Sequence, residues 1–259
     1  MNDMYSANMI SNIILRYDIV LIQEIREQDD AGFKALWKRV LSLNPTYRYE
    51  ISDRLGVSKE KYAFMWRVNK LEKLTCYIYH DNEHEFDRSP FIGIFHSIEG
   101  NFDFIYIGIH ADVAHIVSEL DKLHDVSKQT QKFWSVKEVI IGGDFNIACG
   151  NVPTRKISEI GLVVDLNYQW LIPAKTFTTL NQCANDRFVI TGDILKSAFN
   201  SVSSINIMKE YSLSVNKAMS VSDHFPIGLR LVFTSPNKDY PDPYDRKNIA
   251  KNLIYNNRV

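Results

Sequence analysis

Polar side chains that could bind a metal ion or transfer a proton stand beside three short apolar runs of the chain. These residues are Glu24, Asp144, Asn146, Asp223 and His224. Ligands in α/β proteins bind where the ends of buried strands converge, so we expect these residues to share one rim. Oxygen donors without a thiolate suit Mg²⁺ or Mn²⁺. A histidine beside a carboxylate suits proton transfer near neutral pH. A lone Asp at a strand end is more typical of a turn or a helix N-cap, and Ser-Asp-His-Phe-Pro alone is equally typical of a turn, so only the joint occurrence of the motifs favours a site.

The elements that must position these residues alternate between helical and extended patterns. Helical spacing of apolar residues is found at 4–17, at 31–43 and after Asp112, which we take as an N-cap. Strand patterns are found at 18–22, 47–51, 61–67, 73–79, 90–97, 102–110, 136–141, 187–191 and 226–233. The sequence therefore predicts one α/β domain over residues 1–234, with a mainly antiparallel sheet. From 235 to 259 prolines and basic residues predict a mildly basic, flexible tail.

Composition narrows the class of protein. With 259 residues, 45% of them hydrophobic and 24% charged, the chain is long and apolar enough for a sizeable core. Its 30 basic and 31 acidic residues give a formal charge of −1, so a polyanion must be met by a local patch or a bound metal. No apolar run reaches the ~18–20 residues of a membrane helix, which predicts no membrane partner. The first residues contain no signal peptide as written.

The order of these motifs resembles the deoxyribonuclease I family of the endonuclease/exonuclease/phosphatase superfamily. GDFN (143–146) and SDH (222–224) mark the superfamily, whereas QWLIP (169–173) and CANDR (183–187) mark the deoxyribonuclease I branch. The stretch from YHDNE to FDRSPF, without a local pair of cysteines, resembles the gamma-like members of the family more than deoxyribonuclease I itself. The resemblance implies a four-layer α/β/β/α sandwich. It further implies a monomeric endonuclease that hydrolyses double-stranded DNA with Mg²⁺ or Mn²⁺. Uncatalysed phosphodiester hydrolysis is very slow, so a metal ion that stabilises the charge of its transition state suits this reaction.

The resemblance also implies roles for single residues. It implies two proton-transfer pairs, His224 with Asp186 and His110 with Glu60. It implies metal or phosphate ligands at Glu24, Asp144, Asn146 and Asp223, and contacts to DNA from Arg26 and Arg88.

Three cysteines are too few for a disulfide framework and lack zinc-site spacing, so composition allows one bridge or three thiols. The resemblance implies a disulfide between Cys149 and Cys183, with Cys76 a buried thiol. A disulfide requires an oxidising compartment and therefore favours secretion.

The chain also departs from the family pattern. The family opens with a buried strand that carries a catalytic asparagine, and this chain begins at the helix that follows it. The family's calcium loop is shortened to Thr176–Leu180 without its acidic residue, so Ca²⁺ binding is expected only in altered form. Two alternatives stay open: a catalytically impaired, truncated member that binds DNA or protein, and a phosphodiesterase with another substrate.

Overall fold

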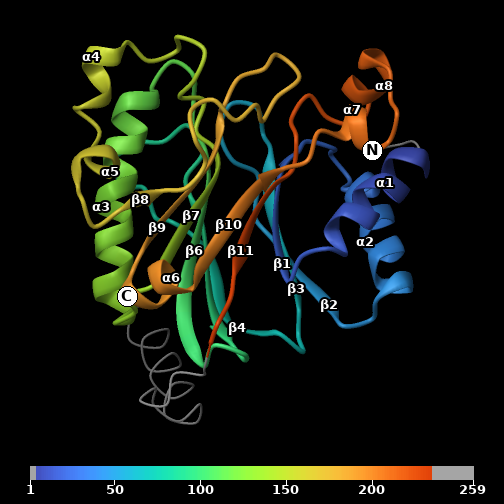
Figure 1. The fold of residues 1–259 in the computed structure, drawn as a ribbon, viewed down its shortest axis with the longest axis horizontal. Helices are drawn as coiled ribbons and strands as arrows, with labels where there is room; N and C mark the ends of the chain where they lie inside the picture. The colour runs from blue at the N-terminus through green and yellow to red at the C-terminus, as the bar shows by residue number, and fades with distance from the viewer. Residues whose placement is uncertain (1–3, 235–259) are drawn as a thin grey trace.

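Two layers of β-strands lie face to face between two groups of helices in the computed structural model of the chain, which describes residues 4–234 (Figure 1). One sheet has six strands in the order β4-β5-β6-β7-β9-β8. Their bounds are β4 Leu71–Ile78, β5 Phe91–Ser97, β6 Phe102–His110, β7 Val139–Asp144, β8 Gln169–Trp170 and β9 Asp186–Thr191. Only β6 and β7 pair in parallel among these strands. A parallel pair needs a crossover, and α3 (Ile116–Trp134) supplies it.

The second layer of strands is in two separate pieces. Strands β1 (Ile19–Ile25), β3 (Lys61–Arg67) and β2 (Tyr47–Ile51) form a sheet in the order β1-β3-β2. Strands β10 (Phe199–Ser204) and β11 (Ile227–Leu231) form an antiparallel pair of their own. In Figure 1 the β10–β11 pair lies alongside the β1 sheet, and both face the six-stranded sheet.

Helices cover the outer faces of both layers. The apolar face of α3 packs on β5, β6 and β7 through Leu120, Leu123 and Val126. On the opposite side, α1 (Met4–Ile14) and α2 (Ala31–Leu43) cover β1 to β3. Short helices lie in the connections: α4 Thr154–Ile157, α5 Gly161–Val164, α6 Asp193–Ala198, α7 Ile207–Glu210 and α8 Val215–Met219.

The core between the two layers is aromatic. Phe64 of β3 stacks on Phe91 of β5 with ring centroids 5.0 Å apart, and it meets Phe95 edge-on at 5.6 Å. Large rings from both layers interdigitate here, so the packing holds the two layers in a fixed relation. The ends of the strands are therefore held rigidly, which is what a site at their rim requires.

The predicted elements agree with the structure except in a few places. The helix at 31–43 and the strands at 47–51, 61–67 and 102–110 have the predicted bounds. Asp112 is not the N-cap that we expected: α3 begins at Ile116 after His115, and Asp112 lies in the preceding loop. Strand β10 was not predicted, because its sequence FNSVSS has too few apolar residues for a strand pattern.

The expected tail, 235–259, lies outside the described residues. Among residues 4–234, no helix is long and apolar enough to span a bilayer.

Candidate active site

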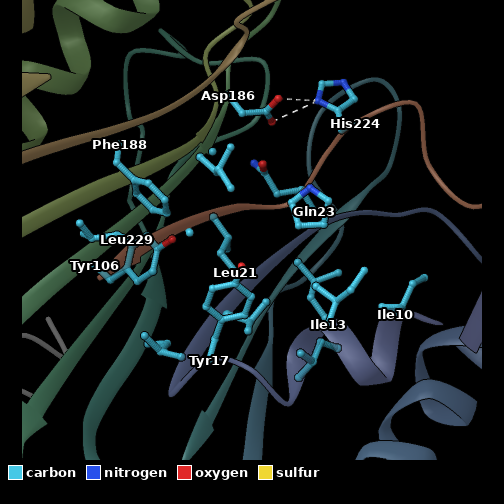
Figure 2. Close-up of a pocket in the computed structure, with 18 of the residues that line it drawn as sticks. Ile10, Ile13, Tyr17, Leu21, Gln23, Tyr106, Asp186, Phe188, His224 and Leu229 are labelled. Atoms are coloured by element: carbon cyan, nitrogen blue, oxygen red, sulfur yellow. Dashed lines mark hydrogen bonds and ion pairs between the residues drawn. The ribbon is translucent and has the colours of Figure 1, made fainter. Parts of the chain in front are cut away.

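Three neighbouring strands end at the same rim of the six-stranded sheet. His110 ends β6 and is level with Asp144, which ends β7. Asp144 is in turn level with Asp186, the first residue of β9. His224 precedes β11 and joins this row from the second layer through its contact with Asp186, as Figure 2 shows. Strand register therefore places His110, Asp144 and Asp186 side by side, and the hydrogen bond to Asp186 adds His224.

Each histidine is held by a carboxylate on its Nδ1 atom. His110 Nδ1 lies 2.7 Å from Glu60 Oε1, and His224 Nδ1 lies 2.9 Å from Asp186 Oδ2. The Nε2 atoms of the two rings are 3.6 Å and 3.7 Å from the same atom, Asp144 Oδ2. With Nδ1 occupied, both rings place Nε2 near the same Asp144 oxygen, which is suited to proton transfer to and from a substrate bound there.

Burial and charge set the protonation of this row. Burial, with the neighbouring Asp186 carboxylate, raises the pKa of Asp144 to about 6. Burial of His224 acts to lower its pKa, but the hydrogen bond and charge of Asp186 outweigh it and raise the pKa to about 9. Burial of Glu60 acts to raise its pKa, but the His110 hydrogen bond and nearby positive charges lower it overall. The site thus has an excess of buried carboxylate that favours a bound cation.

Glu24 reaches the rim through an irregularity in β1. The pairing of β1 with β3 shifts between Ile22 and Ile25, and Glu24 between them has a left-handed backbone with φ 58°. A bulge re-aims a side chain, here toward the site. Glu24 Oε1 lies 3.9 Å from His110 Nδ1, and Glu24 Oε2 lies 3.1 Å from the guanidinium of Arg26.

The two arginines expected to contact DNA lie on the Glu60 side of the site in different surroundings. Arg26 is exposed and forms ion pairs with Glu24 and, at 3.5 Å, with Glu60. Arg88 is only 7% exposed. Its Nε donates to the carbonyl of His110 at 2.9 Å and lies 3.3 Å from Glu60 Oε1. Arg88 therefore holds the His110–Glu60 pair in place, while Arg26 is available at the surface.

The predicted metal ligands are not assembled equally. Asn146 donates its amide to Ala111 O at 2.9 Å, and its own backbone N–H donates to Asp144 Oδ1 at 2.8 Å. Asp223 is exposed next to His224. Within residues 4–234, no cluster of three or more His, Cys, Asp or Glu side chains has the arrangement of a metal cage. Glu24 and Asp144 are the carboxylates of this rim that could hold a divalent cation together with waters and a substrate phosphate.

Sequence reasoning missed several residues that hold the site together. Gln23 bridges the two layers: its Nε2 donates to Ile109 O at 2.7 Å, and its Oε1 accepts from Asp144 N at 3.1 Å. The position of Gln23 directly before Glu24 was the one feature of the sequence that could have indicated its role. Gly143 has φ 139°, and a Cβ there would lie 2.0 Å from Ile109 O, so only glycine fits before Asp144.

Glu119 of α3 is a further residue with no sequence signal. Its carboxylate is fully buried and accepts the backbone N–H of Asp87 and that of Asp112, each at 2.9 Å. These two loops adjoin Arg88 and His110, respectively. Glu119 therefore ties together the loops on both sides of the His110 pair.

The expected disulfide is confirmed. Cys149 and Cys183 are bonded, with Cα atoms 5.6 Å apart, and Cys76 is free and half-buried. The bond connects the loop after β7 to the segment before β9. It therefore braces the two loops that follow Asp144 and precede Asp186.

Residues 2–224 match the endonuclease/exonuclease/phosphatase family, and the chain belongs to that family. Within it, the chain is 35% identical over 241 residues to deoxyribonuclease-1 of Bos taurus, which covers 87% of this chain and 84% of the relative. It is 33% identical over 252 residues to deoxyribonuclease gamma of Rattus norvegicus, covering 90% and 81%. The chain is thus a member of the deoxyribonuclease I family, as its motifs indicated.

Solved structures show the same fold. An endonuclease/exonuclease/phosphatase of Bacteroides vulgatus superposes with a TM-score of 0.60 at 14% identity, covering 88% of this chain and 90% of the other. TDP2 of D. rerio, in complex with a single-strand DNA product, gives a TM-score of 0.62 at 14% identity, covering 88% and 92%. The expected mixed α/β class is confirmed.

Proposed function

We propose that this chain is a metal-dependent endodeoxyribonuclease that hydrolyses DNA phosphodiester bonds by general acid–base catalysis. One observation carries the proposal: two histidine–carboxylate pairs present their Nε2 atoms 3.6 Å and 3.7 Å from the same Asp144 oxygen. Hydrolysis of a phosphodiester needs one proton removed from water and one supplied to the leaving oxygen. Two histidines that lie near one carboxylate oxygen can perform both transfers.

The roles of the two histidines follow from their partners. His224 takes the proton from water, and Asp186 orients the ring and stabilises the positive charge that forms on it. His110 donates a proton to the leaving 3′ oxygen, and Glu60 holds that ring at 2.7 Å. Arg88 fixes the backbone of His110 through its carbonyl.

Glu24 and Asp144 would hold Mg²⁺ or Mn²⁺ through their carboxylate oxygens, with Asn146 and Asp223 near the bound phosphate. The cation would supply positive charge that stabilises the phosphate and favours the neutral form of His224. Both carboxylates lie in the same cavity. Segment 176–180 lacks the acidic residue of the family's calcium loop, so Ca²⁺ binding is proposed only in altered form.

The proposed substrate is double-stranded DNA, cut by a monomer in the secretory pathway or outside the cell. Deoxyribonuclease relatives support the substrate, and the disulfide supports an oxidising compartment. Arg26 is exposed beside Glu24 and is the proposed contact to the DNA backbone. Arg88 is buried on the same side of the site, where it contacts the His110 carbonyl and Glu60.

Plasmid relaxation tests the proposal. With Mg²⁺ or Mn²⁺ we expect supercoiled DNA to be nicked, and excess EDTA to stop the reaction. His110→Ala and His224→Ala should each lower kcat by roughly 10²–10⁴, and the double variant should lose much less than the product of the two effects. His80→Ala, a change at an exposed histidine, is the matched control. Folded single variants that cleave within a few-fold of the parent, or cleavage in EDTA, would overturn the mechanism.

A second candidate is a family member that binds DNA without cleaving it. The specific observation in its favour is that β1 and β11, which adjoin Glu24 and His224, do not pair with each other. Retained DNA binding with no nicking by the folded, metal-loaded protein would favour this candidate. Cleavage of an RNA or lipid phosphodiester in preference to DNA would instead indicate another substrate.

A further inference from the structure

The proposed site takes its two cation-binding carboxylates from different layers of strands. Asp144 ends β7 of the six-stranded sheet, whereas Glu24 belongs to β1 of the second layer. The two carboxylates can serve one cation only if the layers keep a fixed relation at this rim. A contact at the rim itself must therefore set the separation of Glu24 and Asp144.

Gln23 provides this contact, because it directly precedes the β1 carboxylate in the chain and bonds to the backbone of the other layer. Its Nε2 donates to Ile109 O at 2.7 Å, and its Oε1 accepts from Asp144 N at 3.1 Å. Figure 2 shows Gln23 in the cavity that Asp186 and His224 also line. One half-buried side chain thus joins β1 to both β6 and β7.

The two groups that Gln23 bonds face each other at the end of the β6–β7 ladder. Ala111 N donates to Asp144 O there. With this register, regular parallel pairing brings the C=O of Ile109 and the N–H of Asp144 to the same rung. The carboxamide meets the acceptor of that rung with its donor and the donor with its acceptor. It therefore fixes the backbone next to His110 and at Asp144 together.

The arrangement at this rung requires a carboxamide. Ile109 O needs a donor and Asp144 N needs an acceptor, and a glutamine side chain has both on one planar group. A carboxylate at position 23 would place an oxygen against Ile109 O, and an apolar side chain would bond to neither group. Gly143 supplies the space, because a Cβ there would lie 2.9 Å from Nε2 and 3.1 Å from Oε1 of Gln23.

We propose that Gln23 is a positioning residue of the active site, whose carboxamide sets the Asp144 carboxylate relative to Glu24 and His110. The inference rests on the proposed function, which assigns the two carboxylates to one cation and His110 to proton transfer. Gln23 acts through Asp144 and not on the substrate itself. Partners that orient metal ligands typically contribute about 10–100-fold to metal affinity or activity.

The test compares the full chain with its Gln23→Met variant, which keeps the length of the side chain and removes both hydrogen bonds. In plasmid nicking, kcat should fall roughly 10–100-fold while KM for DNA stays within about threefold, because the reacting groups and not the DNA contacts are displaced. Mn²⁺ alone, titrated into DNA-free protein and followed by electron paramagnetic resonance, should bind about tenfold or more weakly.

Gln131→Met is the matched control. The Nε2 of Gln131 also donates to a backbone carbonyl, Lys137 O at 2.7 Å, but this bond lies before the start of β7 and not at its end. The control variant should keep the kcat and the Mn²⁺ affinity of the parent. Thermal melting shows whether each variant is folded.

Nuclear magnetic resonance tests the contact without a nuclease assay. The parent should show scalar coupling through the hydrogen bond between Gln23 Nε2 and the carbonyl carbon of Ile109. The amide of Asp144 should exchange with solvent several-fold faster in Gln23→Met than in the parent. If the variant does not fold, the coupling in the parent decides whether the contact exists.

Two results would overturn the proposal: absence of the coupling, or a folded Gln23→Met variant with a lower Tm but the kcat and Mn²⁺ affinity of the parent. Equal losses of kcat in Gln23→Met and Gln131→Met would also overturn it, because the effect would then not depend on the rim. A parent that does not nick DNA would contradict the proposed function instead. The coupling and the exchange of the Asp144 amide would still show whether Gln23 holds Asp144.

Discussion

Asp186 controls the charge of His224 more than any other single residue. Its carboxylate lies 2.9 Å from Nδ1 of the ring and is the main reason that the pKa of His224 rises to about 9 although burial opposes it. A raised histidine pKa stabilises the fold fully below the ordinary value of 6.5. That contribution is lost as the pH rises through about 9.

Asp186→Asn should therefore lower the pKa of His224 in the metal-free protein, as measured by an NMR pH titration. The difference in unfolding free energy between parent and variant should be larger at pH 6 than at pH 9.5. Asp223→Asn is the control, because the Asp223 charge is the weakest of the contributions to this pKa. If the pKa of His224 is the same in the Asp186 variant and the parent, the hydrogen bond does not have this effect.

At the scale of elements, one carboxylate from α3 fixes two loops of the site. Glu119 accepts the N–H groups of Asp87 and Asp112 at 2.9 Å each. Burial raises its pKa, although both hydrogen bonds favour the charged form. Glu138, at the other end of the sheet, is also a buried carboxylate that accepts two backbone N–H groups. It accepts the N–H groups of Ile194 and Leu195 at the start of α6.

Glu119→Gln should replace one of the two acceptors with a donor and destabilise the protein by about 1–3 kcal/mol, as measured by urea denaturation. It should also lower kcat several-fold with little change in KM, because the His110 and Arg88 loops lose their common anchor. Glu138→Gln is the matched control, with a similar loss of stability and an unchanged kcat. An equal loss of kcat in both variants would show that Glu119 acts through stability alone.

At the scale of the whole molecule, the Cys149–Cys183 bond closes a loop of 34 residues that carries α4, α5 and β8. A cross-link of this length restricts the unfolded chain and is expected to stabilise the fold by roughly 3–4 kcal/mol. The contribution is global, because both ends of the loop lie next to strands of the six-stranded sheet.

The Cys149→Ser/Cys183→Ser double variant should melt several degrees below the parent. A reductant should lower the melting temperature of the parent and leave that of the double variant unchanged. Cys76→Ser, at the free thiol, keeps the effect of reductant and serves as the control. A parent melting temperature that does not respond to complete reduction would contradict this expectation.

The family, the fold class and most of the strands could be predicted from the sequence, because strand periodicity and the motifs around Glu24, Asp144 and His224 are local patterns. It could not predict β10, whose polar residues become a strand only by pairing with β11. Nor could it show that Asp112 lies outside α3, since the N-terminal boundary depends on contacts with Glu119.

The tertiary structure alone decided how the site is assembled. The register of β6, β7 and β9 sets His110, Asp144 and Asp186 level with one another, and the sequence separations between them carry no such information. It also decided that Arg88 is buried behind His110, whereas Arg26 is exposed.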